Sequence, residues 1–497
     1  MSSRIARVRP GSLAIALALV AGAIGAPAVA AAPAAGRTVP RPVSVAAVPT
    51  SGARTCAVTL NGTSYRSLAA ATQAAVDGDT IRVRGVCPGM AIVESDITIV
   101  GVRTATSGAP TVTGQGAGRP ITIWPGSDVT IRNLVIRDGW SGNEGGGIYL
   151  EFSAVTLDGV TMMRNRAVRG GAIYAYQSSV TLDGETLLHR NRAYFEPGGA
   201  VYAGDSTVVM NDTSRVTRNR VIDDHAGGFD LNRSDLTMND RSRIDHNVTI
   251  GDNGGGVRLQ AYDQNSYTIT LNDDARIDHN RAWDGYGGGI YAGGDDVNVV
   301  LNDRASIDRN VADSGGGLFG QYDLTMNGSS QIFRNTAEAS GGLSFSGTNL
   351  LLTMNDSARI ARNVSEDSGG GIRLGGSTTL TMNGTSAILR NATLGDGGGI
   401  YMYDGPTVVM NDSARVAGNI AGGLGGGLTV EVATLTMNGS AVVTGNRHSA
   451  AENGAGVAWC NSTLNGVTAL TNVLGNLAPN GPIGNDAATN VAQHFGC

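Results

Sequence analysis

Three short segments in which apolar and polar residues alternate recur along most of this chain. One has the form LTMN, a second ARIxRN, and a third GGGIYA, in which two or three glycines precede the alternating residues. A period of two residues over a few positions is typical of β-strands rather than helices. Gly, Asn, Asp and Ser lie between the segments and favour turns. We therefore expect three short strands in each repeat.

An asparagine closes each repeat and marks its length. Successive closing asparagines lie between 25 and 33 residues apart: Asn165, Asn191, Asn219, Asn247, Asn280, Asn310, Asn335, Asn363, Asn391, Asn419 and Asn446. A period in this range indicates a solenoid, in which every repeat forms one turn of a coil. Equivalent strands of neighbouring turns then pair in parallel, about 4.8 Å apart. The pattern predicts an all-β fold, a three-sided parallel β-helix.

The register assigns columns of residues to the inside and to the turns. An apolar column should fill the interior, where methionine suits irregular space. It comprises Met210, Met238, Leu271, Leu301, Met326, Met354, Met382, Met410 and Met437. The closing asparagines, and a second polar column eight residues before them, should form ladders whose side-chain amides satisfy backbone groups in the turns. The glycines before the third strand should permit positive φ at a sharp corner.

The two ends of the chain differ from the repeats. Residues 64–85 predict a short helix over Tyr65–Ala75 and a first strand over Thr80–Arg84. Such a helix would cap the first turn and hide its open sheet edge. We divide the chain into a signal peptide (1–30), a Pro/Ala-rich disordered linker (31–54), a cap with the first turn (55–89), the β-helix repeats (90–476) and a C-terminal cap (477–497).

The first 30 residues have the features of a secretory signal peptide. Arg4, Arg7 and Arg9 precede the apolar run SLAIALALVAGAIG, and AVA at 28–30 offers a cleavage site. The run is shorter than the roughly 20 residues that span a bilayer. We therefore expect a cleaved, secreted, extracellular protein with no transmembrane anchor after cleavage, rather than one held by an uncleaved anchor.

Composition narrows the classes of function. The 497 residues include 73 glycines and only 5% aromatic residues, yet 41% are hydrophobic, which is too much for a disordered chain. The net charge is −6 and no basic tract is present, so we expect no nucleic-acid partner. In an oxidising compartment the nearest pairing of the four cysteines joins Cys56 to Cys87 and Cys460 to Cys497, but sequence alone leaves the connectivity open.

Several stretches resemble known β-helix families. GDTIRVRG, SDVTIRNLVIRDG and SAVTLDGVTMMRN resemble the secreted proteins of the pectate-lyase-like superfamily, over about 55–497. GGAIYA at 170–175 and IFRN at 332–335 resemble repeats of the polymorphic outer membrane proteins. The resemblance implies a single-stranded right-handed parallel β-helix with a short N-terminal capping helix. It does not fix an activity, because this fold hosts lyases, hydrolases, epimerases, adhesins and phage tailspikes.

One outward column follows the glycines of each repeat and is rich in aromatic residues and arginine. Aromatic faces at the spacing of the turns could hold sugar rings or partner side chains, and arginine could bind carboxylates. The alternative is that these residues stack on one another and only stabilise the sheet. The candidate binding residues are Tyr149, Tyr174, Tyr202, Arg258, Tyr291, Phe319, Arg373 and Tyr401.

A second outward column contains aspartates. Asp245, Asp278 and Asp308 occupy equivalent positions of three successive repeats, and Arg243 and Arg276 stand two residues before the first two. Carboxylates about 5 Å apart repel one another unless a cation compensates. In pectate-lyase-like enzymes acidic residues on adjacent turns hold calcium while an arginine or lysine removes a proton, so the resemblance makes these five residues candidates for catalysis and the three aspartates candidates for calcium. A surface lattice of Arg–Asp pairs is the alternative.

Together these features predict a secreted β-helix protein whose repetitive surface binds an extracellular polysaccharide or a cell surface, without catalysis. Near-identical repeats favour this hypothesis, because enzymes of this shape usually carry one irregular group of turns with long loops. The alternative is a calcium-dependent polysaccharide (uronate) lyase or a related carbohydrate-active enzyme. The longest insertion, at 260–270, and a group of further acidic residues make 220–315 the first region to examine.

Overall fold

The computed structural model describes residues 56–104, 108–294, 296–449, 454–468, 471–477 and 491–493. The expected signal peptide and linker, and most of the expected C-terminal cap, lie outside these residues. Within the described part of the chain, no helix is long and apolar enough to cross a lipid bilayer.

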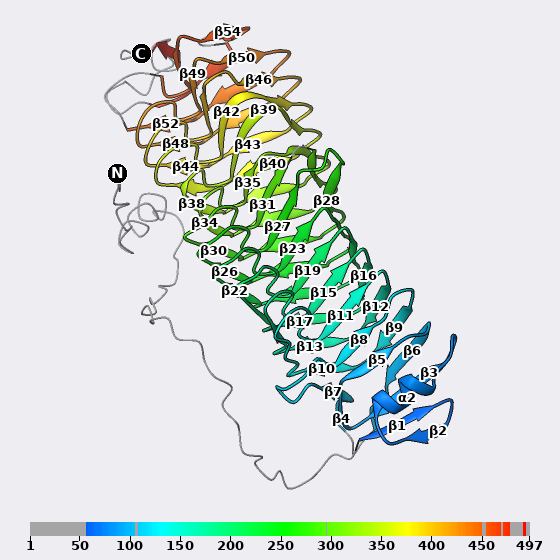
Figure 1. The fold of residues 1–497 in the computed structure, drawn as a ribbon. Coiled ribbons are helices and arrows are strands. Elements are labelled where there is room, and N and C mark those ends of the chain that lie inside the picture. Colours follow the sequence, from blue (N-terminus) through cyan, green and yellow to red (C-terminus); the bar gives the residue numbers. More distant parts are fainter. Residues whose placement is uncertain are drawn as a thin grey trace, which may run out of the picture.

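The chain forms a β-solenoid of about 14 turns with three parallel sheets. Successive turns stack along one axis in sequence order, from β1 (Ala57–Leu60) at one end to β54 (Thr463–Asn465) near the other (Figure 1). A regular turn consists of four short strands, as in β15 (Ile173–Tyr176), β16 (Ser179–Asp183), β17 (Leu187–His189) and β18 (Arg192–Tyr194). The prediction of a three-sided parallel coil is confirmed.

The largest sheet takes two strands from each turn, which is why three sheets accommodate four strands. Among the described residues it has 30 strands, and the other two sheets have 15 and 11. In two turns the strands of the large sheet merge into single long strands, β39 (Leu343–Met354) and β42 (Ile372–Met382). The 15-stranded sheet runs from β4 (Val86–Pro88) to β55 (Val473–Leu474), and the 11-stranded sheet from β14 (Arg166–Ala167) to β52 (Arg447–His448).

Buried ladders hold the turns in register. The methionine and leucine column is paired residue by residue from Met210 to Met437 and lies in the apolar core. The closing asparagines form an unbroken buried ladder from Asn165 to Asn476, in which each Nδ2 and each backbone N–H donates to the side-chain oxygen one turn ahead. Each Nδ2 also donates to a backbone carbonyl of the turn before, for example from Asn247 to Val216. The predicted role is therefore confirmed for the closing asparagines, whereas the amides of the second column donate to one another's side-chain oxygens, for example from Asn272 to Asn239.

The corner glycines are required by the tight approach of neighbouring turns. Gly287 has φ 66°, and a Cβ there would lie 2.3 Å from the carbonyl oxygen of Ile290. At Gly288 a Cβ would lie 2.6 Å from the carbonyl oxygen of Gly316 in the next turn. No side chain fits at such distances, so the glycine runs belong to the fold and not to a ligand loop.

The N-terminal cap differs from the prediction, because the helix covers the end of the core while a separate strand pairs with the sheet edge. Helix α2 (Leu68–Ala74) begins three residues later than expected, because the Ser67 hydroxyl accepts a hydrogen bond from the N–H of Ala70 and caps it. The backbone edge of β3 (Thr80–Arg84) is not hidden by the helix but paired, antiparallel, with β1. The helix instead closes the open end of the apolar core with Leu68 and Ala71. The blue end of Figure 1 shows this arrangement.

A disulfide ties this cap to the coil. Cys56, just before β1, is bonded to Cys87 in β4, which is the nearest pairing that the sequence offered. The expected partner of Cys460 is Cys497, which lies outside the described residues. The bridge thus fastens the antiparallel cap to the first strand of the 15-stranded sheet.

Candidate functional site

The outward aromatic and arginine column has the register that the repeats predict. Its members pair in order along the large sheet, from Tyr149 through Tyr174, Tyr202, Asp230, Arg258, Tyr291, Phe319, Ser344 and Arg373 to Tyr401. All eight candidate binding residues therefore lie along one line. A binding role for them stays a prediction.

The rings of this column cover one another. Tyr149 and Tyr174 are stacked with centroids 5.2 Å apart, and Tyr174 and Tyr202 repeat the same spacing. Arg119 lies over the ring of Tyr149, at 4.5 Å from its centroid. Only 8% of Tyr174 is exposed. Because their faces are occupied, these rings offer edges to a ligand, and the geometry favours a stabilising role for this part of the column.

The column is interrupted where Asp230 and Arg258 replace aromatic residues. Asp230 is buried and the Arg258 side chain is 12% exposed, and Arg258 Nη1 donates to Asp230 Oδ1 at 2.8 Å. Among the described residues Asp230 Oδ2 has no hydrogen-bond partner. Burial raises the pKa of Asp230 above its ordinary value, and the Arg258 charge offsets only part of that effect. The pair is a break in the stack with one unsatisfied oxygen.

The three aspartates of the second column pair in register but are not exposed. Asp245, Asp278 and Asp308 follow one another in β25 (Arg243–Asp245), β29 (Arg276–Asp278) and β33 (Ser306–Asp308). Their side chains are at most 1% exposed, so the expectation of open surface positions is wrong. The reason is that long side chains from the same turn and the turn before fold over the carboxylates.

Arginines from the preceding turn neutralise two of these carboxylates. Arg215 forms a bidentate pair with Asp245, with distances of 2.5 and 2.8 Å, and Thr217 also donates to Asp245. Arg243 donates to Asp278 Oδ2 through Nη2 at 2.6 Å. Burial alone would raise the pKa values of Asp245 and Asp278, but the hydrogen bonds and the arginine charges outweigh it and lower both.

The third aspartate lacks such a partner from the turn before. Arg276 forms no ion pair with any described residue, whereas Arg309 donates to Asp308 at 2.6 Å and Ser306 donates at 3.0 Å. Burial and the nearby charge of Asp278 raise the pKa of Asp308. Since arginine or histidine groups already occupy oxygens of all three carboxylates, the arginine alternative accounts for this column without calcium.

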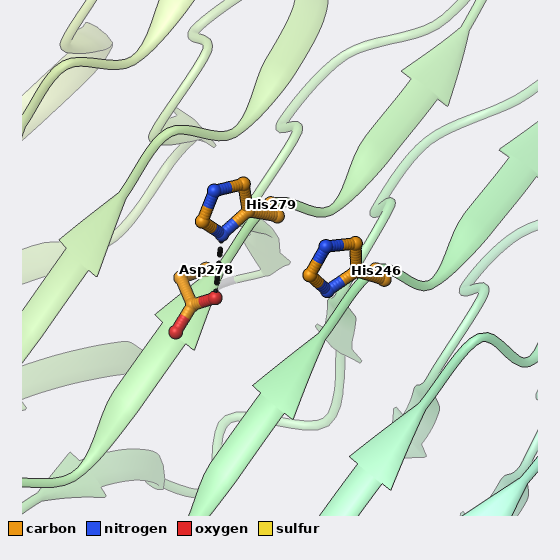
Figure 2. Close-up of side chains that lie close together, drawn as sticks. All are labelled: His246, Asp278 and His279. Carbon is orange, nitrogen blue, oxygen red and sulfur yellow. Dashed lines mark hydrogen bonds and ion pairs between the residues drawn. The ribbon is translucent and has the colours of Figure 1, made fainter.

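Two histidines lie beside this column on neighbouring turns. His246 Nδ1 is 2.9 Å from Asp245 Oδ1, and His279 Nδ1 is 2.7 Å from Asp278 Oδ1. The two imidazole rings are stacked, with centroids 4.8 Å apart and planes 5° from parallel. Figure 2 shows the two rings side by side, with Asp278 next to His279. Possible ligand atoms of His246, Asp278 and His279 lie within 4.8 Å of one another, and a second such group consists of Asp224, His225 and Asp252.

A long, shallow groove that is wide open to solvent crosses the turns of the large sheet. It has a volume of about 690 Å³ and lies where each turn bends from the first strand of that sheet into the second. Six steps from turn to turn separate its ends at Asp96 and Tyr267, or about 29 Å at the usual strand spacing. Its lining consists of Asp96, Gly126, Ser127, Asp128, Phe152, Ser153, Ala154, Gln177, Ser178, Ser179, Asp205, Ser206, Thr207, Arg233, Asp235 and Tyr267.

A serine ladder builds the bend along which the groove runs. The N–H groups of Ser153, Ser178 and Ser206 each donate to the serine hydroxyl one turn ahead, at 2.9 to 3.2 Å. The residue before each of these serines has a left-handed backbone, with φ 50° at Phe152 and 46° at Gln177. This conformation turns its side chain out of the sheet, so Phe152 is 53% exposed at the groove.

Charge in the groove is mostly negative. Four of the lining residues are aspartates and one is an arginine, Arg233, which forms a bidentate pair with Asp205 at 2.6 and 2.7 Å. Sequence reasoning missed this site because the residues at its bend differ from turn to turn. The serine that precedes the second strand of each repeat, as in FSAV, QSSV and DSTV, was the available signal.

Comparison of this chain with protein-family models, with curated proteins and with solved structures gives no match. The fold and the geometry of its surface are therefore the basis for assigning a function.

Proposed function

We propose that this protein binds a linear, neutral polysaccharide along the groove between Asp96 and Tyr267, without catalysis. The observation that carries the proposal is the groove itself, which runs across seven successive levels of the coil. A ligand that repeats along its length can make similar contacts at each level. The expected secretion of the chain agrees with an extracellular polymer as ligand.

The lining has the chemistry that a sugar polymer needs. Short side chains such as Ala154, Ser179 and Thr207 are part of the lining, so a flat ring can approach the sheet there. Serine, threonine and glutamine side chains can exchange hydrogen bonds with hydroxyl groups. Phe152 supplies an exposed aromatic surface for the apolar face of a sugar ring; it meets Tyr176 edge to face at 6.2 Å, which leaves one of its own faces unstacked.

The negative charge of the lining favours a neutral polymer over a polyuronate. Repeated carboxylates of a uronate chain would face Asp128 and Asp235, and like charges at an interface oppose binding. The hypothesis of a calcium-dependent uronate lyase is weakened by the same argument and by the arginine pairs on Asp245 and Asp278.

The test compares two exposed phenylalanines. Phe152→Ala removes the aromatic surface in the groove, whereas Phe195→Ala removes an equally exposed ring, at 59%, outside it. Affinity for a panel of soluble neutral polysaccharides is measured by affinity electrophoresis and calorimetry. We expect about tenfold weaker binding for Phe152→Ala, as for the loss of one aromatic contact, and no change for Phe195→Ala.

Three outcomes would overturn the proposal. They are an equal loss in both variants, binding to polyuronates alone, and calcium-dependent release of unsaturated uronides that Asp278→Asn abolishes. The last result would establish the lyase alternative instead. A melting temperature within a degree or so of the wild type in both variants serves as the folding control.

A further inference from the structure

One position in the repeat is arginine in most turns and histidine in two neighbouring turns. It directly precedes the closing asparagine and has a left-handed backbone, with φ between 53° and 57° in the arginine turns. The arginines are Arg164, Arg190, Arg218, Arg309, Arg334, Arg362 and Arg390. His246 and His279 have the same backbone, with φ 53° and 54°. Since the fold accepts arginine here, histidine is not needed for the backbone.

The aspartate beside each histidine fixes its tautomer. Asp245 and Asp278 are buried and held by arginines, so their carboxylates can only accept a hydrogen bond from the ring. The proton of each imidazole therefore sits on Nδ1, at 2.9 Å from Asp245 and 2.7 Å from Asp278. This leaves the lone pair of Nε2 free on both rings. A carboxylate behind Nδ1 is the arrangement that orients histidines for metal binding.

We propose that His246 and His279 form a surface site for a divalent transition metal ion, bound through Nε2 of each ring. The rings are parallel and stacked on adjacent turns, so both free nitrogens lie on the same side of the stack (Figure 2). Metal–nitrogen bonds of about 2.0–2.1 Å, at the bond angles of a square-planar or tetrahedral site, require the two nitrogens to be roughly 2.9–3.4 Å apart. The stacked rings, with centroids 4.8 Å apart, must therefore tilt toward each other at Nε2 about their Nδ1 hydrogen bonds, and both side chains are partly exposed.

The ligand type determines which metal the site takes. Imidazole nitrogen suits Cu²⁺, Ni²⁺ and Zn²⁺, whereas Ca²⁺ requires several oxygen ligands. The oxygens of Asp245 and Asp278 are taken by Arg215, Arg243 and the histidines themselves. The aspartates are thus positioning residues and water completes the coordination. The metal site differs from the calcium site that the sequence suggested, in both its ion and its ligands.

This site is separate from the groove, because it lies on the 15-stranded sheet and shares no residue with the groove lining. Success or failure of polysaccharide binding therefore does not bear on it. The chain has six histidines, and another candidate group, Asp224, His225 and Asp252, must be distinguished from it.

The experiment is a calorimetric titration of the full chain, without a histidine tag, with Cu²⁺, Zn²⁺ and Ca²⁺. The test variants are His246→Arg and His279→Arg, which restore the residue that the other turns carry and so preserve the fold. The matched control is His225→Gln, which removes the imidazole of the second group. We expect one Cu²⁺ per chain, bound more tightly than Zn²⁺, and at least a tenfold loss of affinity in either arginine variant.

We also expect His225→Gln to bind within about twofold of the wild type, and a large excess of Ca²⁺ not to displace Cu²⁺. The proposal is overturned if the wild type binds Cu²⁺ and Zn²⁺ no better than the His246→Arg/His279→Arg double variant. It is also overturned if His225→Gln alone abolishes binding, or if Ca²⁺ displaces Cu²⁺ stoichiometrically.

Discussion

Two columns of carboxylates run along this coil, and two of the three members of the more deeply buried one have lowered pKa values. The inner column consists of Asp245, Asp278 and Asp308 on the 15-stranded sheet. The outer column consists of Asp313, Glu338 and Glu366 along the 11-stranded sheet, and the charge of Asp284 lies near Asp313. The pKa values of Asp245 and Asp278 are lowered although both are buried, whereas those of Asp313 and Glu366 are raised although they reach solvent.

The neighbours explain this reversal. Each of the first two inner aspartates receives hydrogen bonds from an arginine one turn back and from its own histidine. Asp313 instead stands opposite Glu338, near Asp284, and desolvation together with these two charges raises its pKa to about 6. In a parallel coil every side chain meets its equivalents above and below, so a buried acid keeps a lowered pKa where a base from the neighbouring turn reaches it.

The largest effect should come from removing an arginine of the inner column. Arg215→Met keeps the apolar stem of the side chain but leaves the buried Asp245 without its bidentate partner. We expect the free energy of unfolding to fall by about 3 kcal/mol. This value is at the lower end of the range for breaking a buried ion pair, because the Arg215 side chain is 41% exposed. The loss is measured as a shift in the midpoint of urea unfolding.

Arg276→Met is the matched control, because Arg276 has the same place in its strand but forms no ion pair with any described residue. Its expected cost is below about 0.5 kcal/mol. Equal losses in the two variants would show that packing of the arginine stems, and not charge pairing, stabilises the column.

A smaller effect should come from neutralising the aspartates themselves. Asp245→Asn should cost about 2 kcal/mol at pH 7, because charged hydrogen bonds become neutral ones. The pKa of Asp245 is lowered in the folded state, so its contribution is present above the ordinary carboxyl pKa and is lost as the pH falls through the lowered value. The difference between wild type and Asp245→Asn should therefore disappear in acid.

Asp308→Asn provides the contrast within the same column. The pKa of Asp308 is raised in the folded state, so its charged form already opposes folding at pH 7. We expect Asp308→Asn to be no less stable than the wild type at neutral pH. The difference in stability between the two should not grow as the pH falls. The measurement is the midpoint of urea unfolding of Asp245→Asn and Asp308→Asn between pH 3 and 8. If Asp308→Asn lost as much stability at neutral pH as Asp245→Asn, the assigned pKa directions would be contradicted.

The fold could be predicted from the sequence because the same residue types recur at the positions that set the register. The closing asparagines and the Met210 to Met437 column place every turn on the next without any long-range information. The edge of β3 was not predictable in the same way. Its partner β1 belongs to a cap that occurs once, and one sequence holds no second copy against which to align it.

The sites were harder to predict, because their contacts run between turns and not along the strand. The sequence drew attention to Arg243, two residues before Asp245, but the bidentate partner of Asp245 is Arg215, which lies 30 residues before it. The groove was missed for a related reason. Phe152, Gln177, Asp205 and Arg233 share a backbone conformation and a place in the turn but no residue type.

The smallest effect should come from the outer column, and it should have the opposite sign. Asp313→Asn removes a charge that Asp284 and Glu338 repel, so the variant should be more stable than the wild type at pH 8. Because solvent screens this exposed group, we expect a gain of only about 0.5 kcal/mol.

The raised pKa of about 6 means that the wild type loses this stability as the pH rises through the interval between the ordinary aspartate value and 6. The gain should therefore be small at pH 4, where the carboxyl is protonated in the folded protein and only partly ionised in the unfolded chain, and full above pH 7, as measured by thermal unfolding at both pH values. Asp284→Asn, which removes the neighbouring charge instead, should reproduce part of the gain; a destabilised Asp313→Asn at pH 8 would mean that the outer column is compensated by a cation after all.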